Sequence, residues 1–358
     1  MRSDYRCSHP RAFGGDAIDF LREIQRGLNW ELLQFSYNRQ WVRSVGKPVV
    51  FQVELTNKCP MTCQMCPRTH AMTRSLGNMS FPVYERLIDE VAASTSKLFL
   101  HHFGDSLMHP DIGRFIAHAR KRRIKTYLSA NPVLLTADRV AALVDSRLDR
   151  LVLSLDGVTA QTSEKVRGRA ARNVELAEQR IDELLAYRAG AGTGKPFITL
   201  QFVRQRQNAH EVGDWLRKWR AKDGIDRVRV KSYSTWNGDE EKIRELQLDT
   251  RPPSSVVCMR PWTSVTVLWD GRVVPCCFDY DGLLTLGNLN ESSLHEIWRG
   301  ENLTRMRKMH RDGKFGEIAL CASCEDREGY PVRKIFYPLN RMKSHSSPIG
   351  EEWKDYEA

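Results

Sequence analysis

Short apolar runs alternate along the chain with longer segments of helical periodicity. The runs rich in Val, Ile, Leu and Phe predict strands, and the segments in which apolar residues recur every three or four positions predict amphipathic helices. The predicted strands, six in all, cover residues 49–55, 97–103, 124–129, 150–155, 197–203 and 227–231. The predicted helices cover residues 18–33, 82–93, 111–122, 136–145 and 209–222, with one long helix between the fourth and fifth strands that ends near Gly190.

The alternation of strands and helices determines the expected fold class. Strands separated by helices are joined by right-handed crossovers, which place the strands in parallel in one sheet. Six such units fall short of the eight that close a full barrel. We therefore expect an α/β fold built as a partial (β/α)6 barrel, with an open doubly wound sheet as the alternative.

A smaller module is expected after the last of these strands. The segment 264–277 contains two β-rich runs on either side of Asp270-Gly271, a dipeptide typical of a hairpin turn. The segment 236–253 before it is rich in charge and ends in Arg-Pro-Pro, which is typical of a linker. The predicted organisation is an N-terminal helical segment at 1–47, the partial barrel at 48–235, a linker at 236–257, a cysteine-rich β-hairpin and helix module at 258–335, and a C-terminal tail at 336–358.

Composition excludes several classes of protein. Hydrophobic residues make up 41% and charged residues 28% of the 358 residues, as in a folded globular chain. No run approaches the roughly 18 apolar residues of a membrane span, and the N-terminus lacks the apolar core of a secretion signal, so we expect a cytoplasmic protein. The net charge of +11 is dispersed and no nucleic-acid-binding module is recognisable, so we expect neither a membrane nor a nucleic acid as partner.

The cysteines indicate metal binding. An odd number, nine, in a chain without an export signal argues against a disulfide framework. Apart from Cys7, which receives no role, they form two groups about 190 residues apart. Clustered thiols in a reducing compartment usually bind metal. The groups comprise Cys59, Cys63 and Cys66, and then Cys258, Cys276, Cys277, Cys321 and Cys324.

The first group has the spacing C-x3-C-x2-C and follows directly after the first predicted strand. Three thiolates at this spacing can hold three irons of a 4Fe–4S cube and leave the fourth iron open to an external ligand. Structural zinc sites instead use four protein ligands. Three buried cysteines without a ligand would not be expected at adjacent positions of a polar loop. We therefore interpret Cys59, Cys63 and Cys66 as ligands of a 4Fe–4S cluster with one open iron.

This motif, placed after the first strand of a six-unit (β/α) chain, resembles the radical S-adenosylmethionine enzymes. The resemblance covers roughly residues 48–235 and implies that the open iron binds S-adenosylmethionine, whose cleavage releases a 5′-deoxyadenosyl radical. It also implies a turn after the second strand that receives the methionine amino group, here with Asp and Ser in place of the usual Glu and Pro. The residues matched to contacts with S-adenosylmethionine are Gly104, Asp105, Ser106, Ser129, Asn131, Ser154 and Arg167.

The second group supplies four thiols, at Cys258, Cys276, Cys321 and Cys324. Their spacing alone fits a four-thiolate zinc site about as well as it fits a fully ligated 4Fe–4S cluster. The flanking segments 269–276 and 286–298 resemble the SPASM extension of radical S-adenosylmethionine enzymes. The later C-x5-C-x3-C part of that extension is missing, so the match is to the shortened, single-cluster "twitch" form of the 2-deoxy-scyllo-inosamine dehydrogenases and related aminocyclitol and aminoglycoside-biosynthesis enzymes. The resemblance thus implies two 4Fe–4S clusters.

The resemblance further implies oxidation of a secondary alcohol of an aminocyclitol or aminosugar to a ketone, with an electron passing to the auxiliary cluster. A flavodoxin or ferredoxin is the expected reducing partner. A general base is required, and Asp279 and Asp281 are candidates, although both residues could simply shape a turn. Cys277 is either a small buried hydrophobe or a hydrogen-atom donor. The alternatives are epimerisation, dehydration or decarboxylation of a sugar-like substrate, or peptide modification.

Overall fold

The computed structural model describes residues 13–236, 241–248, 255–325 and 327, and the side chains of residues 13–19 and 241–242 are not described. Within these residues the chain forms a nine-stranded sheet in the order β6-β5-β4-β3-β2-β1-β7-β8-β9. The first six strands are parallel, and each pairs with its neighbour in sequence. The predicted (β/α)6 arrangement is confirmed, and the barrel is not closed. The strands are β1 (Val49–Val53), β2 (Lys97–Phe99), β3 (Lys125–Ala130), β4 (Arg150–Ser154), β5 (Phe197–Arg204), β6 (Arg227–Ser232), β7 (Ser264–Val267), β8 (Arg272–Val274) and β9 (Gly287–Asn288).

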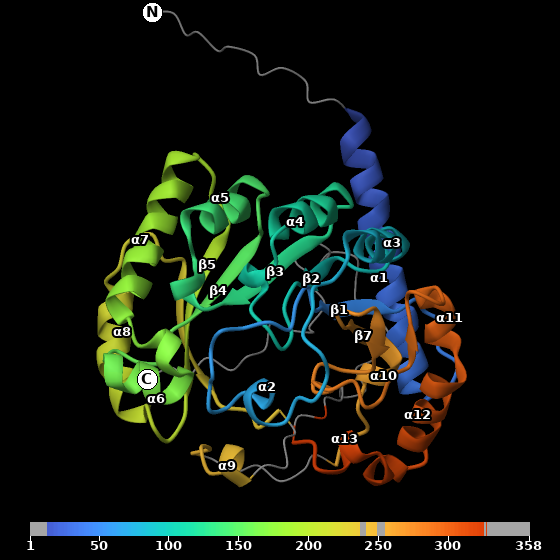
Figure 1. The fold of residues 1–358 in the computed structure, drawn as a ribbon. Helices are drawn as coiled ribbons and strands as arrows, with labels where there is room; N and C mark the ends of the chain where they lie inside the picture. Colours follow the sequence, from blue (N-terminus) through green and yellow to red (C-terminus); the bar gives the residue numbers. More distant parts are fainter. Residues whose placement is uncertain (1–12, 237–240, 249–254, 326, 328–358) are drawn as a thin grey trace, which may run out of the picture.

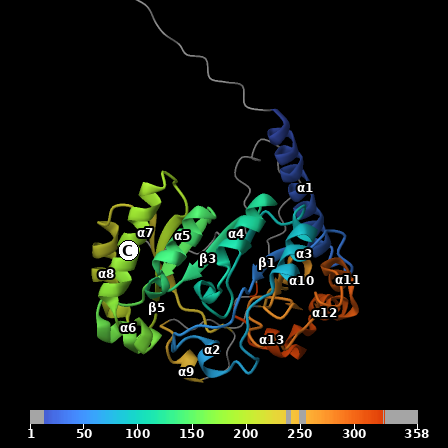
Figure 2. The same ribbon diagram turned by 45° about the horizontal axis from the view of Figure 1, so that its top comes forward.

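Amphipathic helices cover the outer face of the parallel strands. They bury apolar side chains such as Phe115, Leu143 and Trp215 against the strands, which removes this surface from water. Figures 1 and 2 show these helices ranged along one side of the curved sheet, opposite the loops that carry α2. The helices are α3 (Phe81–Val91), α4 (Ile112–Lys121), α5 (Ala137–Asp145), α7 (Val174–Gly190) and α8 (Val212–Arg220).

Two expected elements differ from the structure. The single long helix before Gly190 is three pieces, α6 (Ala160–Arg167), a 3-10 turn at Arg169–Ala171, and α7. The break lies at Gly168, whose φ of +87° is incompatible with a continuing helix. The second strand ends at Phe99 rather than at residue 103, because the chain there turns into the loop that carries Gly104 and Asp105.

The C-terminal segment extends the same sheet. β7 pairs in parallel with β1, and β8 returns antiparallel to β7 through the predicted Asp270-Gly271 turn. Short helices then pack beside this edge: α10 (Arg260–Thr263), α11 (Leu294–Arg299), α12 (Glu301–Arg311) and α13 (Ala319–Ala322). The expected linker contains α9 (Glu241–Arg244). Residues 328–335 of the expected module and the predicted tail at 336–358 lie outside the described residues.

The N-terminal helix α1 (Phe13–Asn38) is longer than the predicted 18–33 and packs on the body of the molecule. Arg26 is 6% exposed and donates hydrogen bonds to the carbonyls of Ala92 and Arg123. The indole of Trp262 in α10 donates to the carbonyl of Trp41, just beyond α1. Among the described helices, none combines the length and hydropathy needed to cross a bilayer.

Candidate functional site

The first cysteine group lies in the loop after β1. α2 (Pro67–His70) begins immediately after Cys66, and the backbone N–H of Cys66 donates to the carbonyl of Cys63 at 3.1 Å. The guanidinium of Arg68 donates to the carbonyls of Cys59 at 2.7 Å and of Met61 at 2.8 Å. Arg68 therefore folds the loop back on itself, so that all three cysteines of the motif lie in one small apolar cluster, separate from the main core.

The protonation chemistry of these thiols fits a bound metal cluster. Burial raises the pKa of Cys59 to about 12 and that of Cys66 to about 11, and it also raises the pKa of Cys63. Burial of three negative thiolates together favours the protonated thiols. Cationic iron reverses this preference, because it binds thiolates and so deprotonates its ligands. The donor set is thus suited to hold iron through Cys59, Cys63 and Cys66.

Arg167 reaches this loop from the end of α6. Backbone N–H groups of Thr62 and Gln64 donate to the carbonyls of Arg167 and Val166, at 3.1 and 3.0 Å. The Arg167 guanidinium lies 3.7 Å from Cys63 Sγ and forms a two-point ion pair with Asp156. Burial lowers the pKa of Arg167, but the pairing with Asp156 outweighs burial and raises it. Arg167, which the resemblance matches to a contact with S-adenosylmethionine, therefore lies beside the cysteine loop and is held by the carboxylate of Asp156.

The turn after β2 also contacts the cysteine loop. A Cβ on Gly104 would overlap the carbonyl of Thr56 and lie 2.6 Å from Asn57 Cα, so only glycine permits this approach. The backbone N–H of Asp105 donates to the carbonyl of Lys58 at 2.9 Å. The hydroxyl of Ser106 donates to the carbonyl of Leu100, which anchors the turn from within the core.

Asp105 and Asn131 are brought together from two strands. One Asp105 oxygen accepts from the backbone N–H of Asn131 at 2.8 Å, and the other accepts from Leu107 at 3.1 Å. Burial raises the pKa of Asp105 to about 6. Ser129 lies near the end of β3, two residues before Asn131, and Ser154 is the last residue of β4. Of the residues matched to S-adenosylmethionine contacts, Gly104, Asp105 and Arg167 therefore contact the segment that contains the cysteine loop. Ser129, Asn131 and Ser154 lie at or just beyond the carboxyl ends of their strands, where parallel sheets bind ligands.

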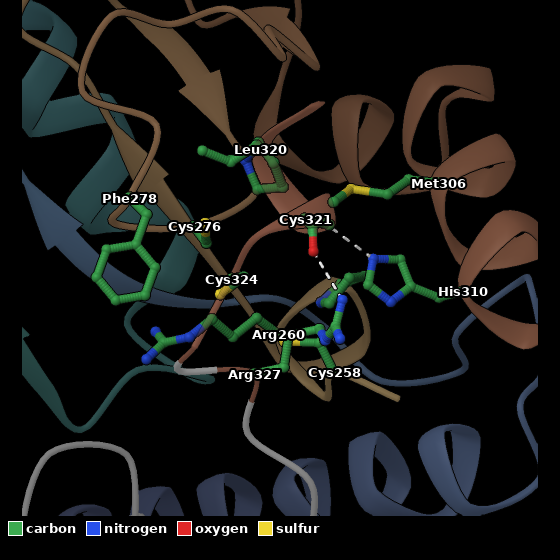
Figure 3. A pocket seen from close by; sticks show the side chains of 12 residues that line it. Cys258, Arg260, Cys276, Phe278, Met306, His310, Leu320, Cys321, Cys324 and Arg327 are labelled. Atoms are coloured by element: carbon green, nitrogen blue, oxygen red, sulfur yellow. Dashed lines mark hydrogen bonds between the residues drawn. The ribbon is translucent and has the colours of Figure 1, made fainter. Parts of the chain in front are cut away.

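The four thiols of the second group line a single pocket (Figure 3). Cys258 precedes α10, Cys276 follows β8, Cys321 lies in α13, and Cys324 follows α13. Burial raises the pKa of Cys321 to about 12 and raises that of Cys276. Within the described part of the chain, no three His, Cys, Asp or Glu side chains are grouped as they would be around a single metal ion. Four thiols that line one pocket are a donor set suited to a fully ligated cluster.

The structure gives both predicted base candidates partners in the backbone. Asp279 is 1% exposed, and its two oxygens accept from the N–H groups of Leu283 and Leu284, each at 2.8 Å. Burial raises the pKa of Asp279. Asp281 accepts from the backbone and hydroxyl of Thr73 at 2.7 and 2.6 Å, which lowers its pKa despite burial. Asp279 thus shapes a turn, and Asp281 fastens this turn to the loop after the first cysteine group.

Residues that sequence reasoning did not connect link the two cysteine sites. Glu54, directly after β1, is completely buried and binds Arg74 through two hydrogen bonds of 2.6 and 2.5 Å. Its carboxylate also lies 3.5 Å from His102, and the other ring nitrogen of His102 lies 2.8 Å from the carbonyl of Cys277. Cys277 itself is 6% exposed. In the sequence, a charged Glu directly after an apolar strand was the feature that could have drawn attention to Glu54. Nothing in the sequence indicated that Arg74 and His102 would be its partners.

Family models match the two segments of the chain that carry the cysteine groups. The family model described as "Radical SAM superfamily" matches residues 53–188, and the model described as "SPASM", an iron-sulfur cluster-binding domain, matches residues 258–325. The S-adenosyl-L-methionine-dependent 2-deoxy-scyllo-inosamine dehydrogenase of Niallia circulans is 23% identical over 283 residues, which cover 77% of this chain and 92% of that protein. The PqqA peptide cyclase of Granulibacter bethesdensis is 28% identical over 319 residues, which cover 80% of this chain and 82% of that protein.

Solved structures share the fold. The crystal structure of BtrN in complex with AdoMet and 2-DOIA has a TM-score of 0.52 at 19% identity and covers 79% of this chain and 97% of that chain. Streptococcus suis SuiB bound to precursor peptide SuiA has a TM-score of 0.56 at 16% identity and covers 91% of this chain and 79% of that chain. The resemblance inferred from the cysteine motifs is confirmed: the chain is a radical S-adenosylmethionine enzyme with a SPASM domain, and its cofactors are S-adenosylmethionine and 4Fe–4S clusters.

Proposed function

We propose that the enzyme oxidises a secondary alcohol of an aminocyclitol or aminosugar to a ketone. When bound, the cofactors supply a 5′-deoxyadenosyl radical that takes a hydrogen atom from the carbinol carbon, and an auxiliary cluster that accepts the remaining electron. The hydroxyl proton is released to a base, so the substrate loses two hydrogens in all. The similarity to the Niallia circulans dehydrogenase over 92% of its length supports this reaction.

The observation that carries the proposal is the second cysteine pocket. Four thiols line it, at Cys258, Cys276, Cys321 and Cys324. A cube with a protein ligand at each corner has no position left for a substrate, so its useful chemistry is one-electron transfer. An alcohol oxidation begun by hydrogen-atom abstraction requires such an acceptor, whereas a redox-neutral isomerisation does not.

Residues of the chain assemble the site between the two cysteine groups. Arg68 folds the first cysteine loop, Arg167 and the Asp105–Asn131 pair border it, and Asp281 ties it to the segment that follows Cys276. These hydrogen bonds restrain the two metal sites relative to each other, and defined geometry is what hydrogen-atom abstraction and electron transfer require.

Two other outcomes deserve a direct comparison. Similarity to PqqA peptide cyclases at up to 28% identity favours a peptide as the second candidate substrate. Epimerisation is the second candidate reaction on a sugar, because the buried Cys277 thiol directly follows Cys276 and is suited in principle to return a hydrogen atom. Epimerisation would leave the substrate mass unchanged and introduce solvent deuterium.

The test uses anaerobically reconstituted protein, expected to hold about eight irons per chain, four in each cube. The protein is incubated with S-adenosylmethionine, a low-potential donor such as flavodoxin or ferredoxin, and a panel of aminocyclitols, aminosugars and peptides. We expect a product two hydrogens lighter from an aminocyclitol or aminosugar. A mass loss confined to peptides, or deuterium uptake without mass loss, would refute the dehydrogenase proposal.

The variant Cys258→Ala separates the radical step from electron transfer. Loss of one ligand should abolish ketone formation while 5′-deoxyadenosine release continues, because the first cysteine group is untouched. The measurement is the ratio of ketone to 5′-deoxyadenosine. Cys7→Ala is the matched control, since Cys7 belongs to neither group. Unchanged ketone formation in Cys258→Ala would rule out the auxiliary cluster as electron acceptor.

A further inference from the structure

A histidine that belongs to neither cysteine group projects into the second pocket. His310 lies in the last turn of α12, is completely buried and lines the pocket with the four thiols. Its Nε2 lies 3.6 Å from Cys321 Sγ, within hydrogen-bonding distance for sulfur, as Figure 3 shows. Ligands at different corners of a cube diverge from one another, so a nitrogen this close to Cys321 Sγ is placed to donate to that sulfur rather than to bind another iron.

Aromatic neighbours hold the imidazole in this orientation. Trp262 packs against it edge to face, with ring centroids 6.3 Å apart, and the Phe315 ring lies 5.9 Å away. Both tryptophan and histidine are completely buried, so the ring has little freedom to turn. The other nitrogen, Nδ1, is buried without a hydrogen-bond partner in the described residues. The contact with Cys321 is therefore the polar interaction that the structure provides for this ring.

Two arginines add positive charge to the same pocket. Arg327 donates from Nη1 to the carbonyl of Cys321 at 2.7 Å, and its guanidinium lies 4.0 Å from the Phe315 ring centroid. Arg260 also lines the pocket, and each arginine is 8% exposed. Charges buried to this extent are screened less by solvent than charges on the surface, so both arginines make the pocket more positive.

We propose that His310, supported by Arg327 and Arg260, raises the reduction potential of the auxiliary cluster. Reduction adds one electron and therefore one negative charge to the cluster and its thiolates. An N–H donor on a ligand sulfur and nearby cations stabilise that added charge, which makes electron uptake more favourable. The inference rests on the proposed function, in which this cluster accepts the electron that the substrate loses. His310 acts as a positioning and tuning residue, without contacting the substrate.

The test measures the potential directly and needs no substrate. In a full-length background with Cys59, Cys63 and Cys66 changed to Ala, the auxiliary cluster is the cluster that remains, and its EPR signal is followed through a redox titration. His310→Leu, which removes the N–H donor, should shift the midpoint to more negative potential. His310→Gln retains an N–H donor, so its midpoint potential should lie close to that of the protein with His310. The control is His295→Leu, because His295 is exposed on α11 of the same module.

An equal midpoint in this background with and without His310→Leu would overturn the proposal. A second measurement decides the matter if His310→Leu fails to retain the cluster. Pulsed EPR of the reduced wild-type holoenzyme labelled with ¹⁵N-histidine should show a weak nitrogen coupling, and its absence would equally overturn the proposal. Because both readouts are independent of turnover, a failed search for the alcohol substrate would leave them unaffected.

Discussion

The buried pair of Glu54 and Arg74 offers a sharp test of what holds the two metal sites together. Glu54 follows β1 and is completely buried, and the Arg74 side chain is 5% exposed. Arg74 also donates to the carbonyl of Tyr280, beyond the second cysteine group. The variant Arg74→Met removes the charge and both of these contacts while preserving most of the side-chain volume. It leaves Glu54 beside His102 with long backbone contacts, 3.4 Å from Phe103 and 3.3 Å from Trp269.

The magnitude follows from the pKa of Glu54. Burial by itself raises this pKa, but hydrogen bonds from Arg74 and His102 outweigh burial and lower it from 4.5 to about 2. At 1.36 kcal/mol for each tenfold change in acidity, the ionised carboxylate is favoured in the folded protein by roughly 3 kcal/mol. Removing one partner of a buried ion pair typically costs about 3–5 kcal/mol. We therefore expect Arg74→Met to lower the free energy of unfolding by about 3 kcal/mol or more.

The same change should alter how stability depends on pH. In the wild-type protein the folded pKa of Glu54 lies below the unfolded value, so its contribution is fully present above pH 4.5 and is lost as the pH falls toward 2. Without Arg74, burial dominates and the folded pKa rises above 4.5. The sign then reverses: protonation favours the folded state, so lowering the pH from 8 to 5 should reduce the destabilisation measured for Arg74→Met.

Anaerobic urea unfolding, followed by circular dichroism from pH 5 to 8, measures both effects. The control is Arg217→Met, because Arg217 forms an i,i+3 pair with Asp214 in which the side chains are 80% and 61% exposed. Such a surface pair is worth about 0–1 kcal/mol. The double variant Arg74→Met/Glu54→Gln should recover part of the lost stability, because no charge remains buried. A destabilisation by Arg74→Met no larger than that of the control, with no change in pH dependence, would refute the reasoning.

Two further predictions concern the loops around the first cysteine group. Gly168→Ala should lower the urea midpoint and the iron content, because φ is +87° and a Cβ would overlap Thr62 Oγ1. Gly192→Ala is the control, because Gly192 has a φ of +59° but open space around it, so this change should cost only about 1–3 kcal/mol of backbone strain. Equal effects of the two changes would contradict the overlap with Thr62 as the cause. Asp281→Asn should retain turnover within about tenfold and leave the pH–rate profile unchanged, because the Asp281 oxygens are committed to hydrogen bonds with Thr73. A loss of about 100-fold or more, together with a changed pH–rate profile, would instead identify Asp281 as the base.

Local sequence was sufficient to predict the parallel part of the fold. Short apolar runs placed β1 and β3–β6 within a residue or two of their observed limits, because most strands of a parallel sheet are buried and the sequence shows them as such runs. The Asp270-Gly271 turn was predicted from the dipeptide itself, because glycine readily adopts the positive φ that a tight hairpin turn requires, here +88°. The helix break at Gly168 was missed, since the periodicity of the residues on either side does not show which glycine adopts a positive φ.

The cysteine motifs specified the chemistry, and the tertiary structure determined the roles of the residues around them. The spacing of Cys59, Cys63 and Cys66 indicates a cluster because a short loop can bring these thiols to one cube. No spacing rule predicts that β7 adds to the edge strand β1, that Asp281 binds Thr73, or that His310 meets Cys321. Thr73 and Asp281 are 208 positions apart in sequence, so only the folding of the whole chain brings their polar atoms within hydrogen-bonding distance.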